Sequence, residues 1–419
     1  MKMNRMAMAA ATILATLPAI AHAAPFDPEA ATQAYMATLK GAARAKSDAY
    51  FEGGYWLLLW GTLVAVLADY VILRTGLSVR FRNWAERVTK RRFLQSMLYG
   101  FPYVVTGTMI ILPWTIYSDY VREKQYGLMN QGFGGWIGEQ GINLGLSVVL
   151  LSLIIALVMG GVRRSPKRWW IWGTGIAALF MAFIIMITPV FISPLFNTYT
   201  EMAAGPVRDR IVAMAKSQDI PAEHIYVFDQ SKQHKRISAN VSGLGPTIRI
   251  SLNDNLLART SLPETAAVMG HEMGHYVLNH GLKLTIGFAL MFGFCFWIAS
   301  RLVPGILARR GAAWGLRGID DVAAWPIYSI VVAVLLLAMT PVKNTIIRVH
   351  ESEADAFGLD VAREPDGFAQ ASMKLSEYRK IEPGPVEEFV FYDHPSGRTR
   401  VRMAMEWKAR HLNSREPSQ

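Results

Sequence analysis

Six long apolar segments dominate this sequence and limit what it can fold into. Each has close to the roughly 20 residues that an α-helix needs to cross the hydrocarbon core of a bilayer. They are Tyr55–Leu73, Phe93–Tyr117, Ile142–Val162, Trp169–Ile192, Leu282–Leu302 and Val322–Met339. Charged residues make up only 18% of the chain, whereas a soluble domain has about 25%. We therefore predict a mainly α-helical, polytopic transmembrane protein.

The distribution of positive charge agrees with a membrane protein. The net charge of +11 could indicate nucleic-acid binding, but the chain lacks a basic module interleaved with aromatic residues. Its basic residues gather instead in short loops beside the apolar segments, at 74–92, 163–168 and 301–317. Short basic loops stay in the cytoplasm. We therefore predict the lipid bilayer as a partner, expect no nucleic acid, and place the alternate loops on the outer side.

The N-terminal residues have the features of a secretory signal. Lys2 and Arg5 form a basic region, Met6–Ile20 is apolar, and the Ala-His-Ala sequence at 21–23 fits a cleavage site. We predict that residues 1–23 are a signal peptide, with an uncleaved membrane anchor as the alternative. The short signal predicts a bacterial inner-membrane protein. An exported N-terminus followed by six crossings would place the soluble parts in the periplasm.

The apolar segments divide the chain into membrane and soluble parts. The predicted order is a polar N-terminal segment at 24–54 with one surface helix over 25–50, four transmembrane helices within 55–194, a soluble lobe at 195–281, two transmembrane helices within 282–341, and a second soluble stretch at 342–419. In the first lobe, the pattern predicts a helix at Glu201–Lys216 and strands at Ile225–Phe228, Ile237–Val241 and Ile248–Leu252. The soluble part is thus a small α+β lobe.

Residues 271–275 read His-Glu-Met-Gly-His and form an H-E-x-x-H motif. On a helix, positions i and i+4 share one face, so His271 and His275 can both direct a ring nitrogen to one zinc ion. Glu272 cannot easily join them, but it can act as general base on the water that the metal activates. Pro263 suits the first turn of a helix of about 16 residues around the motif. The alternative is two exposed histidines on an amphipathic helix.

A third zinc ligand is predicted in the segment 350–355, which reads His-Glu-Ser-Glu-Ala-Asp. Glu351 and Asp355 are four residues apart and share a helix face, whereas Glu353 points away. We assign Glu351 as the third ligand, with His350 as its rival. Asp355 would hydrogen-bond the second ring nitrogen of a ligand histidine and fix its tautomer. The alternative is a solvated, acidic start of a helix.

Two other candidate ligands are set aside. His280 is nine residues from His271, which on a continuous helix places it on the opposite face. Cys295 lies in an apolar segment and is interpreted as a small buried side chain.

Together these motifs resemble those of the integral-membrane type I CAAX prenyl proteases and their bacterial relatives, which are gluzincin zinc endopeptidases. The resemblance rests on the pair H-E-x-G-H and E-x-x-A-D, and it extends from about residue 95 to about residue 405. It implies that Glu351 is the third zinc ligand. It also implies that His394 and Arg400 hold the substrate or polarise its carbonyl group. Asn240 matches an asparagine that would meet the substrate backbone.

We therefore predict a membrane-embedded zinc metalloendopeptidase with one zinc ion per chain. Its substrates would be peptides or proteins, which can be membrane-associated. A quality-control protease of broad selectivity with the same chemistry is one alternative. A non-catalytic membrane scaffold is another, and the intact Glu272 argues against it. A transporter would need charge pairs inside the membrane, and the apolar segments contain almost none.

Overall fold

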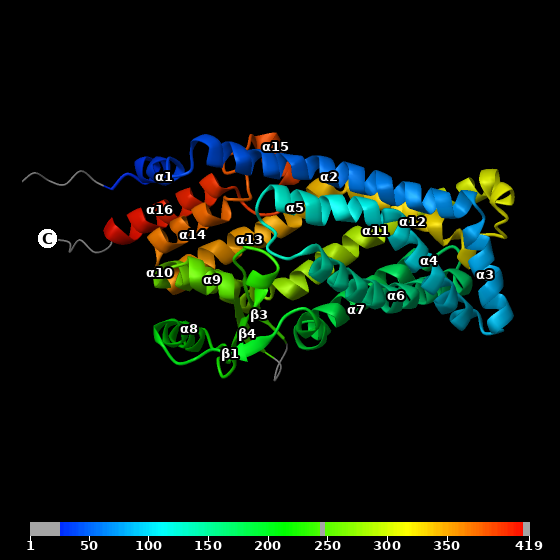
Figure 1. The fold of residues 1–419 in the computed structure, drawn as a ribbon, viewed down its shortest axis with the longest axis horizontal. Coiled ribbons are helices and arrows are strands. Elements are labelled where there is room, and N and C mark those ends of the chain that lie inside the picture. The colour runs from blue at the N-terminus through cyan, green and yellow to red at the C-terminus, as the bar shows by residue number, and fades with distance from the viewer. Residues whose placement is uncertain (1–25, 244–247, 414–419) are drawn as a thin grey trace, which may run out of the picture.

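The computed structural model describes residues 26–243 and 248–413, so the predicted signal peptide at 1–23 lies outside the described residues. Most of the molecule consists of long helices that run along its longest axis (Figure 1). Within the described residues, five helices are long and apolar enough to cross a membrane. They confirm the first five predicted segments, although the helices extend well beyond the apolar residues.

These five helices contain the first five apolar segments in chain order. They are α2 (Gly41–Arg74), α4 (Arg92–Thr115) with its continuations η1 (Ile116–Val121) and α5 (Arg122–Gln125), α6 (Phe133–Arg164), α7 (Trp169–Ile187) with η2 (Thr188–Ile192) and η3 (Ser193–Leu195), and α11 (His280–Arg310). Their outer faces are apolar, since Leu179 is 75% exposed and Leu290 is 68% exposed. Ile155 and Met159 are buried between helices. A helix that is apolar on all sides is suited to lipid.

The sixth predicted segment ends in a bend. It corresponds to η7 (Val322–Ala324) and α12 (Trp325–Ala338), and a bend of 57° separates this pair from α13 (Thr340–Ala362). Pro341 stands in the first turn of α13 and has no N–H to continue the ladder of α12. The bent pair counts as a sixth span if it crosses the membrane as one unit.

The soluble elements gather at one end of the molecule, and α3 (Leu77–Val88) lies at the other (Figure 1). The soluble end holds α1 (Pro28–Met36), α8 (Pro206–Lys216), η4 (Gln230–Lys232), α9 (Asp254–Arg259), α10 (Leu262–Val277), α14 (Pro365–Leu375), α15 (Pro385–Phe391) and α16 (Gly397–Asn413). The short helix η6 (Ala312–Trp314) is not part of this end and directly follows α11 in the chain. Parts of the chain before and after α11 and α12 therefore meet in one lobe. The prediction of a helical membrane protein with a small α+β lobe is confirmed.

A four-stranded sheet lies in this lobe. Its strands are β1 (Tyr199–Glu201), β2 (Ile225–Phe228), β3 (Ala239–Ser242) and β4 (Arg249–Asn253), in the order β1-β2-β4-β3. β2 and β4 are parallel, and the outer strands pair antiparallel to them. Ile250 and Leu252 of β4 pack against Met269 and Met273 of α10. The three predicted strands are present, and β3 forms one edge of the sheet.

Two predicted helices differ from the structure. Residues 25–50 do not form one surface helix, because α1 ends at Met36 and α2 runs without a break from Gly41 into the first span. α1 packs instead against α16. The helix predicted from Glu201 begins at Pro206, since Glu201 belongs to β1 and Gly205 provides an extended turn before the proline.

Candidate metal centre

The sequence sets both ends of α10, the helix that carries the H-E-x-x-H motif. Ser261 caps its first turn, and the Glu264 carboxylate accepts a hydrogen bond from the Ser261 backbone N–H at 2.6 Å, which completes a capping box. Glu264 also pairs with Lys374 at 2.7 Å and thereby ties the helix to α14. The helix has 16 residues, as predicted, and it ends before Asn279, which adopts a left-handed conformation with φ 55°.

Small residues let α10 and α13 approach closely. A Cβ atom on Gly358 would lie 2.6 Å from the backbone nitrogen of His271, and a Cβ on Gly270 would lie 2.8 Å from the Gly358 carbonyl oxygen. One turn further along α10, a Cβ on Gly274 would lie 3.1 Å from the Ala354 Cα atom. Only glycine fits such a contact without a shift of the backbone. The close approach brings the acidic face of α13 against the histidine face of α10.

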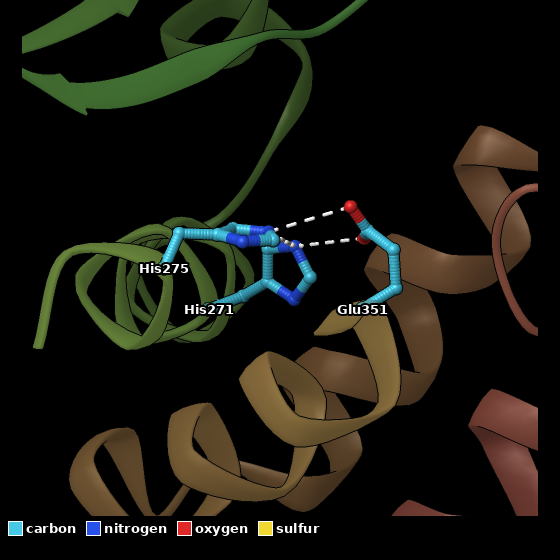
Figure 2. A group of neighbouring side chains, drawn as sticks. All are labelled: His271, His275 and Glu351. Carbon is cyan, nitrogen blue, oxygen red and sulfur yellow. Dashed lines mark hydrogen bonds and ion pairs between the residues drawn. The ribbon is translucent and has the colours of Figure 1, made fainter. Parts of the chain in front are cut away.

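Three of the predicted site residues converge between these helices (Figure 2). The Nε2 atoms of His271 and His275 are 3.1 Å apart. The carboxylate oxygens of Glu351 are 3.3 Å from the Nε2 atom of His271 and 3.4 Å from that of His275. Ligand atoms of these three residues all lie within 4.8 Å of one another. Within the described residues, this is the group of histidine and acidic side chains that could hold a metal ion.

The donor atoms of this group suit a divalent cation. His271 and Glu351 are buried, and the Glu351 Oε2 atom accepts no hydrogen bond from any described residue. Two imidazole nitrogens and a carboxylate that face one point need a positive charge between them. Nitrogen and carboxylate oxygen are ligands that zinc prefers, and three protein ligands leave a position open for catalysis. The residues present therefore fit a catalytic zinc site.

Asp355 and Arg400 lie directly behind His271. The Asp355 Oδ1 atom is 2.7 Å from the His271 Nδ1 atom, the contact expected for a carboxylate that fixes the histidine tautomer. Arg400 donates from Nε to the Asp355 Oδ2 atom at 2.9 Å and from a terminal nitrogen to Oδ1. Both side chains are buried. The family resemblance places Arg400 at the substrate carbonyl, but in the structure its guanidinium is engaged by Asp355.

His280 is the residue that the sequence interpretation missed. Its Nδ1 atom is 2.9 Å from the Nδ1 atom of His275, and its Nε2 atom is 3.0 Å from the Glu353 carboxylate. The prediction that His280 faces away assumes one continuous helix, but the break at Asn279 turns it back toward His275. His350 donates to the Ile346 carbonyl at 2.6 Å, so its geometry gives no support to a ligand role.

Glu272 and His394 border a cavity of about 170 Å³ next to the metal group. Burial raises the pKa of the Glu272 carboxyl above its ordinary value. The His394 Nε2 atom is 3.2 Å from the Glu351 carboxylate. Burial is also the main influence on the His394 ring and lowers its pKa, which favours the neutral imidazole. The arrangement places a carboxylate base and an imidazole beside the metal group.

The edge of the sheet forms another wall of this metal cavity. Ile237, Ser238 and Ala239 line it together with His271 and Glu272. Asn240 lines a neighbouring cavity with Ser238 instead. Unlike Glu272, His394 and Arg400, Asn240 does not line the metal cavity. Side chains alternate between the two faces of a strand, which accounts for the difference between residues 239 and 240.

Comparison with known families identifies the chain. The sequence family described as "Peptidase family M48" matches residues 201–408, and "CAAX prenyl protease N-terminal, five membrane helices" matches residues 29–198. The chain belongs to peptidase family M48. The first match covers the metal group, and the second covers α2, α4, α6 and α7, the four helices of this region that could span a membrane. The protein is thus a membrane metalloprotease related to the CAAX prenyl proteases.

Individual M48 relatives match along most of their length. The "Uncharacterized metalloprotease YhfN" of Bacillus subtilis is 27% identical over 376 residues, which cover 89% of this chain and 88% of the relative. The "CAAX prenyl protease 1 homolog" of Homo sapiens is 24% identical over 400 residues, which cover 84% and 82% of the two chains. The crystal structure of S. mikatae Ste24p has the same fold, with a TM-score of 0.72 at 20% identity over 90% of this chain and 94% of that one.

Proposed function

We propose that this M48 protease hydrolyses peptide bonds with one zinc ion per chain, held by His271, His275 and Glu351. The observation that carries this assignment is that two Nε2 atoms and a buried carboxylate converge on one point. The Glu351 Oε2 atom at this point accepts no hydrogen bond from any described residue. When bound, zinc lowers the pKa of a coordinated water toward about 7 and polarises a carbonyl group.

Glu272 acts as the general base. It lies one residue from His271 on α10, lines the metal cavity, and carries a carboxyl group whose pKa is raised by burial. A raised pKa strengthens a carboxylate as proton acceptor near neutral pH. Glu272 would accept the proton of the attacking water and pass it to the leaving amine.

His394 is positioned to stabilise the charge that develops on the carbonyl oxygen. Its ring borders the metal cavity and faces Glu351, while Asp393 holds the Nδ1 atom at 2.8 Å. Because Asp393 accepts the Nδ1 proton, the ring carries a second proton on Nε2 only as the imidazolium, and that form can direct its Nε2–H at an oxyanion. Arg400 is instead assigned to the support of His271 through Asp355, because its guanidinium is used by that carboxylate.

The substrate peptide would bind along β3. This strand forms an edge of the described sheet, and the residues before it line the metal cavity. An extended peptide can add to such an edge through main-chain hydrogen bonds. The backbone of the edge strand, rather than the Asn240 side chain, would then place the scissile bond beside Glu272.

Metal analysis of purified variants tests the ligand set. We expect one zinc per wild-type chain, and we expect a chelator to abolish peptidase activity until zinc is added back. Glu351→Ala should lose the metal, because two histidines alone leave the site one ligand short. Full zinc occupancy in Glu351→Ala would transfer the third-ligand role to another residue.

A zinc titration of purified variants measures the support that His280 gives to His275. His280→Ala should weaken zinc binding by about 10- to 100-fold, the usual effect of losing a residue that orients a ligand histidine. His280→Gln, which can still accept a hydrogen bond, should recover part of this loss. His224→Ala is the control, because His224 is exposed and lies on β2's flank far from α10 in sequence. Equal affinity in His280→Ala and His224→Ala would rule out the support role.

The orientation in a bacterial inner membrane is proposed from charge. The end of the molecule opposite the catalytic lobe is strongly basic. Its basic residues lie in loops, in α3 and at the ends of the long helices; they are Arg74, Arg80, Arg82, Arg87, Lys90, Arg91, Arg92, Arg163, Arg164, Lys167, Arg168, Arg309, Arg310 and Arg317. Short loops rich in Arg and Lys remain in the cytoplasm. The metal centre would then face the periplasm.

Reporter fusions at the end of α16 test this orientation. Alkaline phosphatase fused after residue 413 should be active, and green fluorescent protein at the same position should be dark. This position leaves α16 intact, so the lobe can fold before the reporter. The reverse pattern would place the metal centre in the cytoplasm.

A further inference from the structure

A second, larger cavity lies beside the metal cavity. It has a volume of about 730 Å³, within the range of about 300–1,000 Å³ typical of pockets that hold ligands. We call it the inner cavity; its walls come from α2, η1, α5, α13 and the segment after α14. Arg379 borders the inner cavity and also lines the metal cavity with His271 and Glu272. This side chain therefore stands where the two cavities meet.

The cations of the inner cavity differ in their partners. Arg236 pairs with the Glu123 carboxylate at 2.6 Å, and Arg122 donates to the Tyr50 carbonyl oxygen. Arg379 and Lys343 have no such partner: among the described residues, neither side chain makes a hydrogen bond or an ion pair. Two of the four cations that line the inner cavity thus have their donors available.

Three carboxylates, those of Asp119, Glu123 and Asp393, also line the inner cavity, and Asp393 is the one on which Arg379 and Lys343 act. The Asp393 Oδ1 atom is 2.8 Å from the Nδ1 atom of His394. Burial alone would raise the pKa of the Asp393 carboxyl, but His394, Arg379 and Lys343 together hold it below its ordinary value. Arg379 and Lys343 are therefore close enough to act on Asp393 electrostatically, and they still leave an excess of positive charge.

The backbone that carries Arg379 is fixed. The Ser47 hydroxyl of α2 donates to the Arg379 carbonyl oxygen at 3.3 Å. The next residue, Lys380, pairs with Glu52 at 2.7 Å and with Glu387 at 2.9 Å. Contacts with α2 and α15 therefore hold the backbone on both sides of the Arg379 side chain.

We propose that Arg379, assisted by Lys343, binds a carboxylate of the substrate in the inner cavity. This inference rests on the proposed function, because the bound peptide must already have its scissile bond at the metal. A guanidinium matches a carboxylate with two parallel hydrogen bonds, and a partly desolvated cation gains most from such a partner. A free C-terminus and an Asp or Glu side chain offer the same chemistry.

The alternative role of Arg379 is to balance the charge of Asp393. In that case its loss would affect His394 and the metal group, and it would slow the cleavage of every peptide alike. The carboxylate-binding role instead predicts a loss that depends on the charge of the peptide. Peptides matched in sequence and different in charge therefore separate the two roles.

The experiment uses the full-length, zinc-loaded protein in detergent and one peptide of a casein digest that the wild type cleaves. The peptide is synthesised with a free C-terminus, as the C-terminal amide, and with each Asp or Glu changed to Asn or Gln. The first pair detects binding of the chain terminus, and the others detect binding of an acidic side chain. Binding of the same peptides to Glu272→Gln, measured by fluorescence anisotropy, gives a readout without hydrolysis.

We expect the wild type to favour one carboxylate form by about 10- to 100-fold in kcat/KM, mainly through KM, as for a charge-assisted hydrogen-bond pair. Arg379→Gln should lose this preference and keep its activity on the neutral peptide. Arg398→Gln is the matched control, since Arg398 pairs with Glu29 and Glu382 and lines neither cavity. An equal loss on all peptides, or an unchanged preference, would overturn the carboxylate-binding role alone. No cleavage of any casein peptide by the zinc-loaded wild type would overturn the proposed function and this inference with it.

Discussion

Glu272→Gln is expected to lower kcat by about 10²- to 10⁴-fold while the protein keeps its zinc, because a general base contributes that much to a hydrolytic step. The amide occupies nearly the same volume as the carboxylate but cannot accept the proton of the attacking water. Glu272 is not one of the three residues whose ligand atoms converge, so the metal should stay bound. Single-turnover kinetics and zinc content, measured on the same preparation, check both parts of the prediction.

The comparison between Glu272→Gln and Glu351→Ala separates chemistry from metal binding. Both variants should be inactive, but only Glu351→Ala should lack zinc. Glu201→Gln on the exposed strand β1 is the control for a change of charge in the same lobe. Wild-type hydrolysis by zinc-loaded Glu272→Gln would assign proton transfer to another group, and His394 would then be the first candidate.

Local signals explain why parts of the fold could be predicted so closely. The start of α10 is encoded by Ser261, Pro263 and Glu264, which act within a single turn. The long helices follow from apolar segments that few other structures can accommodate. β1 has only three residues and is stabilised by pairing with β2. Its own sequence is therefore too short to predict a strand.

The metal group could be predicted because residues four positions apart on a helix lie on the same face. His271 and His275 had to share a face of α10, and Glu351 and Asp355 a face of α13. The meeting of the two helices depends on Gly270, Gly274 and Gly358 across the contact, which local patterns do not reveal. The role of His280 depends on Asn279, whose left-handed conformation changes the direction of the chain between α10 and α11.

The position of Arg400 is the part that the motif could not supply. A charged residue near a catalytic motif suggests contact with substrate, and only the fold reveals that Asp355 binds the edge of the guanidinium formed by Nε and one terminal nitrogen. The pairing is non-local, because the partners are 45 positions apart in the sequence. Sequence spacing on one helix carries no information about such a contact.

Removal of Arg400 should therefore destabilise the protein as well as weaken the metal site. Arg400→Ala leaves the Asp355 carboxylate buried with His271 as its remaining partner, and breaking a buried ion pair in this way costs about 3–5 kcal/mol. His271 also loses its fixed partner, so we expect a lower zinc affinity. The thermal unfolding midpoint of the zinc-loaded protein and a zinc titration measure the two effects.

The double variant Asp355→Asn/Arg400→Gln distinguishes this support role from contact with substrate. Two neutral amides leave no unpaired buried charge, so the double variant should regain much of the stability that Arg400→Ala loses. An amide at position 355 is a weaker partner for His271 than the native carboxylate, so zinc affinity should recover less than stability does. A residue whose main contact is the substrate carbonyl would give the opposite result, because Arg400→Ala would then lower kcat/KM at unchanged stability and unchanged zinc affinity. That outcome would return Arg400 to the role that the family resemblance implies, with Asp355 as the carboxylate that orients it.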